Sequence, residues 1–327
     1  MNTTKRLLTL AAAFMAFGLI SNAYAADEDA ASESKMKIED ATKGTVKRDP
    51  SAEKVDEVIT NRKLRAETGS KSKYSVNASL EYKGSTIDKP LAATRPNITR
   101  GANVPATAAL SGSVSGKMRI GSLDYMKAGV GLRADQPLQQ TQDGKKDLYD
   151  PYLSYGRLYN VMGLQNSFDS SLTAFTKESS RKLGYMADFS ISNTTIKEIG
   201  TSGLSVGIYL LAGHSFFDAE DKRYIVNGKD LGRVADYQAD YYLGAYPFAE
   251  YVINDTFNLR TISGVWVYEH ARGADGYTFA KNTIYQSFGL GISVTRDIYL
   301  YPNIQIIPED IRADRTNVAL SANLNAF

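Results

Sequence analysis

The chain has 327 residues, no cysteine, and 38 basic against 36 acidic side chains, for a formal net charge of +2. This balance lacks the strongly basic face typical of nucleic-acid binding. The absence of cysteine excludes a disulfide framework and a lipid-attachment cysteine. Beyond the N-terminal region, no apolar run approaches the roughly 18 residues of a membrane-spanning helix, which excludes a helical membrane protein.

Residues 1–25 have the features of an export signal. Lys5 and Arg6 precede an apolar run over residues 7–20, and residues 23–25 read Ala-Tyr-Ala, which suits cleavage before Ala26. The apolar run is too short to favour a retained transmembrane helix. We therefore expect a signal peptide that is cleaved and a mature chain that is exported.

Residues 26–71 are charged and contain no aromatic residue, so they offer too little apolar surface for a core of their own. Asp49-Pro50 can begin a helix, and Val55, Val58 and Ile59 follow at helical spacing. We predict one short amphipathic helix over about residues 50–66. Two interpretations remain open: a periplasmic leader or partly disordered arm, or a helix that enters the following domain and narrows its interior.

From residue 72 onward the hydrophobic pattern has a period of two, as in β-strands with two different faces. The clearest example alternates Leu110, Gly112 and Val114 with serines. We count twelve strands, with ten or fourteen within the ordinary boundary error. The predicted strands span residues 74–83, 107–120, 125–135, 148–158, 166–176, 183–192, 204–212, 237–245, 257–267, 284–294, 298–306 and 316–327.

The connections between these strands alternate in length. Short turns are expected near residues 121–122, 254–255 and 295–297, and long loops over residues 84–105, 135–147, 217–236, 269–282 and 308–315. Single-chain bacterial barrels have short periplasmic turns and longer external loops. The alternation requires an even number of strands with both ends on the periplasmic side, although the connections at residues 177–182 and 193–202 fit it less well.

Alternation alone does not decide which face meets lipid. A soluble barrel or sandwich with an apolar centre is the alternative, but twelve strands enclose more space than side chains fill in a barrel of about eight. The opposite face carries Ser, Thr, Gly, Asn and charged residues that suit water. We therefore predict an all-β fold, a transmembrane antiparallel up-and-down β-barrel formed by residues 72–327, with lipid outside and water inside.

The last strand supplies a resemblance to a known class. Val318, Leu320, Ala322, Leu324 and Ala326 share one face, and the chain ends at Phe327. This terminus resembles that of Gram-negative outer-membrane β-barrel (porin-like) proteins, whose final strand usually ends in Phe, although Phe327 is out of phase with the apolar face. The resemblance implies location in the cell outer membrane, contact with membrane lipid and lipopolysaccharide, and recognition of the last strand by the barrel-assembly machinery.

In this topology ten charged residues are expected to line the lumen. Opposed charges across a hydrated bore orient dipolar solutes and filter ions, so we predict a porin-like channel for passive diffusion of small polar solutes or ions. The alternative is that the charges pair with each other and fill a narrow barrel. The residues are Lys117, Arg119, Lys127, Arg133 and Arg260, opposed by Glu81, Asp135, Asp150, Asp188 and Asp240.

Four tyrosines, Tyr125, Tyr209, Tyr242 and Tyr285, are also expected to face inward. They would either form a stacking track for sugars or pack against the wall, and we favour packing because tyrosine is a strong strand former.

Two other functional classes were considered. A barrel lipid hydrolase needs a serine and a histidine base, but His214 and Ser215 are strand neighbours that point to opposite faces, and no serine lies near His270 in the sequence. We therefore expect no enzyme, and no motif indicates a metal or another cofactor. A structural or adhesive barrel would act through its long loops or its N-terminal arm.

Overall fold

The computed structural model describes residues 55, 58–68, 72–99, 105–139, 146–218, 223–226, 229–274, 276 and 278–326. The expected signal peptide, the charged residues before Val55 and the terminal Phe327 lie outside these ranges. Within the described ranges, no helix combines the length and the hydropathy needed to cross a bilayer.

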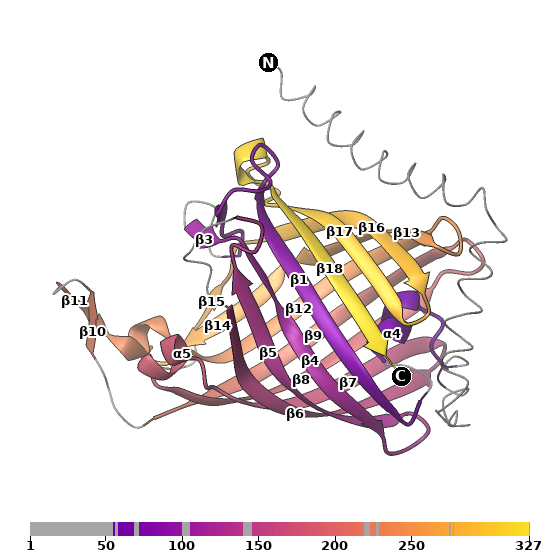
Figure 1. Ribbon diagram of the computed structural model, residues 1–327, viewed down its shortest axis with the longest axis horizontal. Helices are drawn as coiled ribbons and strands as arrows, with labels where there is room; N and C mark the ends of the chain where they lie inside the picture. The colour runs from indigo at the N-terminus through magenta and orange to yellow at the C-terminus, as the bar shows by residue number, and fades with distance from the viewer. Residues whose placement is uncertain are drawn as a thin grey trace. The chain divides into compact units, whose positions relative to one another are not determined.

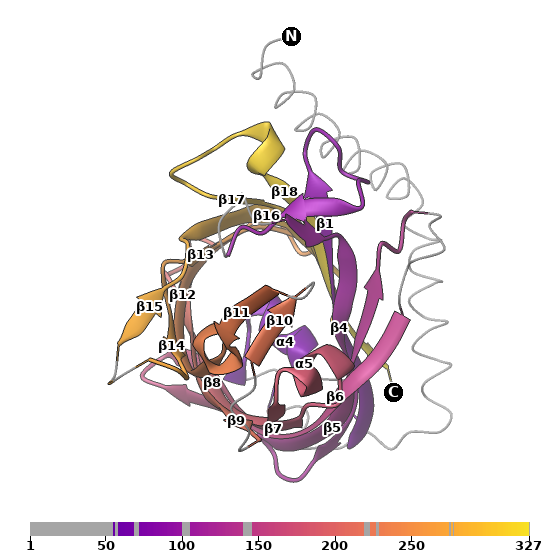
Figure 2. The ribbon, with the colours of Figure 1, turned by 90° about the vertical axis from the view of Figure 1, so that its left-hand side faces the viewer.

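The described chain forms a closed antiparallel barrel of twelve strands, two of which are interrupted, and this confirms the predicted fold class. Each strand pairs with its sequence neighbour, and the last pairs with the first to close the wall (Figures 1 and 2). The strands are β1 (Tyr74–Thr86), β4 (Ala109–Arg119), β5 (Asp124–Asp135), β6 (Lys146–Val161), β7 (Leu164–Ala174), β8 (Tyr185–Glu198), β9 (Leu204–Phe217), β12 (Ala239–Val252), β13 (Phe257–Gly264) continued by β14 (Trp266–Ala271), β15 (Phe279–Lys281) continued by β16 (Tyr285–Thr295), β17 (Ile298–Ile306) and β18 (Asn317–Ala326).

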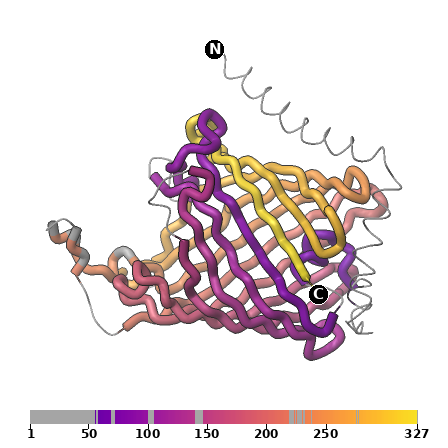
Figure 3. The backbone as a smooth tube through the Cα atoms, in the orientation of Figure 1, coloured from indigo at the N-terminus to yellow at the C-terminus, as the bar shows by residue number. Residues whose placement is uncertain are grey.

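The two ends of the barrel differ in their connections. Brief turns, at residues 120–123, 162–163, 199–203, 253–256 and 296–297, join strands at what we call the short-turn end. The tube trace in Figure 3 shows the longer connections gathered at the opposite, long-loop end. These loops contain β2 (Thr94–Pro96), β3 (Pro105–Thr107), α5 (Glu178–Lys182), β10 (Arg223–Val226), β11 (Lys229–Arg233), η1 (Val234–Tyr237) and η2 (Ala313–Arg315).

The wall has an apolar outer face and a polar inner face. On β9, Leu204, Val206 and Leu210 are 36%, 40% and 43% exposed, whereas Ser205 is buried. On β4, Lys117 faces inward and is only 3% exposed. A barrel that buried its hydrophobic side chains at the centre would show the reverse, so the soluble alternative is wrong for this chain.

The strict alternation fails at bulges, where an extra residue shifts the strand by one position, as in β6 and between β13 and β14. Asp150, with φ of 50°, occupies one of them, because Gly129 and Gly131 of β5 pair with Tyr152 and Tyr149. The second lies between β13 and β14. A period of two over the predicted strand, residues 257–267, places Val267 on the lipid face with Leu259. The structure instead pairs Val267 with the inward-facing Gly244, so this prediction is wrong.

The predicted helix over residues 50–66 is wrong as a continuous element. Val55 and Val58 are helical, but Ile59 to Asn61 are not, and a new helix α4 (Arg62–Glu67) begins after Asn61. The Asn61 side chain caps α4 by accepting a hydrogen bond from the Leu64 N–H at 3.1 Å. The chain turns at Thr60, because Asn61 caps the new helix and the Thr60 N–H donates a hydrogen bond to the Gln165 side chain.

Candidate functional site in the barrel interior

The N-terminal segment, residues 55 and 58–68, lies inside the barrel at the short-turn end. Its residues Val55, Ile59 and Leu64 are at most 2% exposed. They form one cluster with four inward side chains of the wall, from β5, β6, β8 and β12, namely Tyr125, Leu158, Ile196 and Phe248. Figure 2 shows α4 within the ring of strands. The apolar positions that suggested an amphipathic helix therefore contact the barrel wall from within.

A buried polar contact anchors the same segment to β12 and β13. The Asn61 side-chain amide donates a hydrogen bond to Glu250 at 2.7 Å. Glu250 forms an ion pair with Arg260, and each side chain is 6% exposed. The Arg260 guanidinium also lies 4.6 Å from the Phe248 ring centroid. Arg260, predicted as a lumen charge, thus lies in the interior, where its charge is neutralised by Glu250.

A second polar contact explains the turn at Thr60. The backbone N–H groups of Thr60 and Asn61 both donate to the Gln165 side-chain oxygen, at 2.9 and 3.1 Å. The Gln165 amide donates to the Thr60 hydroxyl at 2.5 Å and to Glu198 at 3.1 Å. These bonds satisfy two backbone donors that a continuous helix would have used internally, so β7 decides where the first helical stretch ends.

Three predicted cationic residues gather on one side of the interior. Lys117 and Arg119 extend from β4, and Lys127 extends from β5 directly opposite Lys117 in the strand register. The Lys127 ammonium lies 3.8 Å from the Asp169 carboxylate of β7. The structure therefore brings together the basic residues that the sequence placed on neighbouring strands, around an acid that sequence analysis did not select.

Two other predicted groups pair locally toward the long-loop end. Arg133 contacts Asp135 at 2.6 Å, two residues along β5. Glu81 contacts Lys83 at 3.0 Å, two residues along β1. Since residues two apart share a face of a strand, each pair is a consequence of the local sequence. These inward charges therefore partly compensate each other.

Asp188 faces the interior from β8, which lies four strands round the closed wall from β4. It accepts hydrogen bonds from Tyr242 at 2.8 Å and from Ser215 at 3.0 Å. The strand order places β12, which carries Tyr242, opposite β4 in the closed wall. The Tyr242 hydroxyl that binds Asp188 therefore extends from the strand that faces β4.

Asp150 and Asp240 do not project into the bore, although the alternation predicted that both would line the lumen. Asp150 sits at the bulge in β6, where its carboxylate accepts hydrogen bonds from the Thr176 and Lys177 N–H groups at 2.8 and 3.1 Å. Asp240 lies at a register shift in β12 and contacts the His270 ring at 2.6 Å. Both displacements arise because a bulge reverses the face to which a side chain points.

Inward aromatic rings lie over glycines of the neighbouring strand. Tyr125 is paired with Gly156, where a side-chain carbon would come within 2.1 Å of its ring. Tyr242 is paired with Gly213, where the corresponding distance is 2.2 Å. Glycine in a strand often allows such a close approach. These two tyrosines therefore pack against the wall, as favoured from the sequence.

The two histidines occupy the outer side of the wall near the long-loop end. The His214 ring stacks on Tyr241 with centroids 4.3 Å apart, while the neighbouring Ser215 binds Asp188 on the inner side. His270 contacts Asp240 through Nδ1 and the Gly276 carbonyl through Nε2, at 2.6 and 2.7 Å. Neither arrangement presents a serine nucleophile to a histidine base. In the part of the chain that the structure describes, no three His, Cys, Asp or Glu residues cluster as metal ligands.

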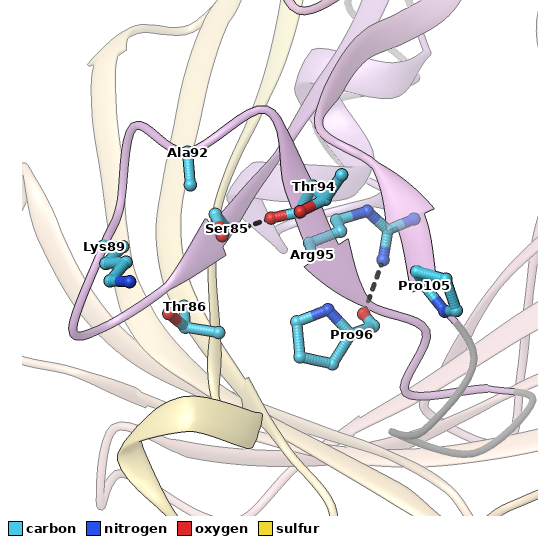
Figure 4. Close-up of a pocket in the computed structure, with 8 residues that line it drawn as sticks. All are labelled: Ser85, Thr86, Lys89, Ala92, Thr94, Arg95, Pro96 and Pro105. Carbon is cyan, nitrogen blue, oxygen red and sulfur yellow. Dashed lines mark hydrogen bonds between the residues drawn. The ribbon is translucent and has the colours of Figure 1, made fainter.

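A cavity of about 290 Å³ lies at the long-loop end between the end of β1 and the β2–β3 hairpin (Figure 4). Ser85 donates a hydrogen bond across it to the Thr94 carbonyl at 2.5 Å. The Arg95 guanidinium donates to the Pro96 carbonyl at 3.3 Å. The first bond holds the hairpin against β1 and the second lies within β2, so the cavity is part of the loop packing.

Four interior residues that make the decisive contacts were not predicted from the sequence. Glu250 faces inward from β12, whose predicted end at residue 245 is too early; extending the period-two pattern to residue 252 finds it. Asp169 faces inward from β7, where the sequence pattern is weak. Asn61 and Gln165 gave no such signal, because their importance comes from a contact between residues 104 positions apart.

No family model and no curated protein matches the chain. Among solved structures, it is similar to NanC porin at 9% identity and a TM-score of 0.42, covering 77% of this chain and 100% of that one. An outer-membrane channel from Pseudomonas putida F1 shows 11% identity and a TM-score of 0.45, over 77% and 95%. Outer membrane phospholipase A from Escherichia coli shows 12% identity and a TM-score of 0.37, over 76% and 89%. These similarities concern the barrel architecture alone.

Proposed function

We propose that this chain is an outer-membrane channel through which small polar solutes or ions diffuse passively, with the N-terminal segment forming its constriction. The observation that supports this most is the contrast between the two faces of the wall: hydrophobic side chains are exposed outside, while Lys117, Asp188 and Glu250 face inside. Such an interior suits water, and charged groups that line a bore bias which ions pass.

The N-terminal segment narrows the short-turn end of the barrel. Only the polypeptide chain itself links it covalently to the wall. Its apolar contacts with Tyr125 and Phe248 and its polar contacts with Gln165 and Glu250 hold it in place. Every one of these contacts is noncovalent, so the segment can leave the mouth and return. We infer that its position sets the conductance.

Single-channel recording in planar bilayers tests the proposal. The full chain should give discrete current steps. Because it has no cysteine, a Thr60→Cys, Glu198→Cys double variant carries the only thiols, at two side chains that form a hydrogen bond. A short bifunctional thiosulfonate reagent should fix the segment and lower the current, and a reductant should restore it. The single variant Glu198→Cys is the control for the reagent.

Silent bilayers with correctly inserted protein would contradict the channel and favour the second candidate, a plugged structural or adhesive barrel. The observation that favours this candidate is the burial of Val55, Ile59 and Leu64 inside the mouth. Reagent-independent current through the cross-linked protein would instead show that the segment does not restrict the bore.

Ion preference provides a separate test of the predicted lumen charges. Replacing Arg119 or Arg133 by Glu should shift the reversal potential in a salt gradient toward cation preference. Unchanged preference would mean that these residues do not line the path of the ions.

We also propose that the protein has no enzymatic activity, that its outer face contacts lipid and lipopolysaccharide, and that the barrel-assembly machinery recognises β18.

A further inference from the structure

Two lysines on the inner wall face each other without enough negative charge nearby. Lys117 of β4 and Lys127 of β5 are direct cross-strand partners, a position in which like charges destabilise a sheet. Both ammonium groups lie over the same Tyr125 ring, 3.8 and 4.9 Å from its centroid. The ring face attracts cations, but it carries no net charge to neutralise them.

Among the described residues, the carboxylates close to this pair are Asp169 and Glu67, and Glu67 is itself paired with Lys63. Asp169 lies 3.8 Å from Lys127. In contrast, the Lys117 ammonium has no hydrogen-bond partner among the described residues, and the whole residue is only 3% exposed. Arg119, also 3% exposed, adds positive charge on the same strand. Arg296, at the β16–β17 turn, is a further cation acting on Lys117, and its own partner is Asp297 at 2.8 Å.

A buried ammonium without a partner is costly, because the lost hydration is not replaced by a hydrogen bond or a counter-charge. Native structures rarely leave such a group unsatisfied, and a bound ion is one way to satisfy it. A neutral solute does not remove the repulsion between Lys117 and Lys127. An anion with several acceptor oxygens does, because it accepts hydrogen bonds from both ammonium groups at once.

We propose that Lys117 and Lys127, with Tyr125 beneath them, form a binding site for an oxyanion: a phosphate, or the carboxylate of an anionic solute. The N-terminal segment packs next to this site, because Val55 and Ile59 belong to the same hydrophobic cluster as Tyr125. The anion therefore binds next to the constriction. That it selects anionic solutes for passage rests on the proposed channel function, whereas binding itself does not.

Inorganic phosphate is the probe, titrated into the full chain in zwitterionic detergent and followed by calorimetry and by thermal unfolding at constant ionic strength. Phosphate should bind and raise the unfolding temperature, and chloride should not. Lys117→Met should weaken phosphate binding by roughly tenfold or more, because a buried charge partner is lost. Lys117→Arg should retain binding, and Lys83→Met, which removes a lysine paired with Glu81, should leave it unchanged.

Two further readouts separate a site from a merely structural role. Without phosphate, Lys117→Met should unfold at a higher temperature than the native chain, because the uncompensated charge is gone. Equal effects of phosphate and chloride, or equal phosphate binding by Lys117→Met, would overturn the site. If phosphate binds as expected but the bilayers stay silent, the anion site is supported and the channel function is contradicted. If current is recorded but phosphate does not bind, the channel function is supported and the anion site is contradicted.

Discussion

Asn61 of the N-terminal segment donates a hydrogen bond to Glu250 of the barrel wall at 2.7 Å, and the two residues are 189 positions apart. Glu250 also holds Arg260 in a buried ion pair. A single carboxylate thus joins the segment that narrows the mouth to two neighbouring strands of the wall. The stability of the barrel and the position of the segment are coupled through this group.

Glu250→Gln should therefore destabilise the barrel and loosen the segment. The amide still accepts from Asn61, but Arg260 loses its counter-charge in a buried place, a change that typically costs about 3–5 kcal/mol. Urea unfolding in lipid vesicles, followed by the fluorescence of the single tryptophan, Trp266, measures the loss. Glu178→Gln, which breaks an exposed ion pair with Lys182 in α5, is the control. A loss no larger than that of the control would mean that the ion pair does not support the wall.

Gly156→Ala should disturb the packing of Tyr125. The added carbon would come within 2.1 Å of the tyrosine ring, so the ring must move away from the cluster that holds Val55 and Ile59. Overpacking of this kind costs about 1–3 kcal/mol. Gly116→Ala is the matched control, because no atom lies within 4 Å of its added carbon. Hydrogen exchange at residues 58–68 should rise in the first variant and stay unchanged in the second.

Two adjacent leucines of β9 test the orientation of the wall. Leu210 is 43% exposed on the outer face, and Leu211 pairs with Gly244 on the inner face. Leu210→Arg should lower the unfolding free energy in vesicles by about 2–4 kcal/mol, because the charge enters the hydrocarbon region. Leu211→Arg meets the polar interior and should cost less. The opposite order would mean that the faces are inverted.

The β10–β11 hairpin at the long-loop end should respond to acid. Arg223 contacts Asp230 at 2.6 Å, and this hydrogen bond lowers the pKa of the Asp230 carboxyl from its ordinary value, with help from the Gly232 N–H. A depressed folded-state pKa gives stability that is present above the unfolded pKa of about 3.9 and is lost as pH falls through the folded value.

Hydrogen exchange of the hairpin amides, corrected for intrinsic rates, should therefore show constant protection from pH 7 down to roughly pH 4 and a decrease below it. Asp230→Asn should remove this dependence, whereas Asp314→Asn in η2 should keep it. Protection that falls with the same pH profile in Asp230→Asn would assign the titration to another group.

The number of strands and the orientation of their faces could be predicted from the sequence because both are local properties. Alternation along Ala108–Ile120 or Leu204–Ala212 needs only the two-residue period of an extended chain. The inward placement of Lys117, Lys127 and Asp188 follows from the same period. The prediction failed at Asp150, Asp240 and Val267, because a bulge shifts the pattern by one residue and leaves little trace in composition.

Only the tertiary structure decided what the N-terminal segment does and which charges are neutralised. The apolar positions of Val55 and Ile59 indicate a helix that needs a partner surface, but not where that surface lies. Closure of the barrel brings Gln165 and Glu250 to Asn61, ends the first helical stretch and places α4 inside the mouth. Such contacts depend on which distant strands meet around the ring, and local periodicity carries no information about that.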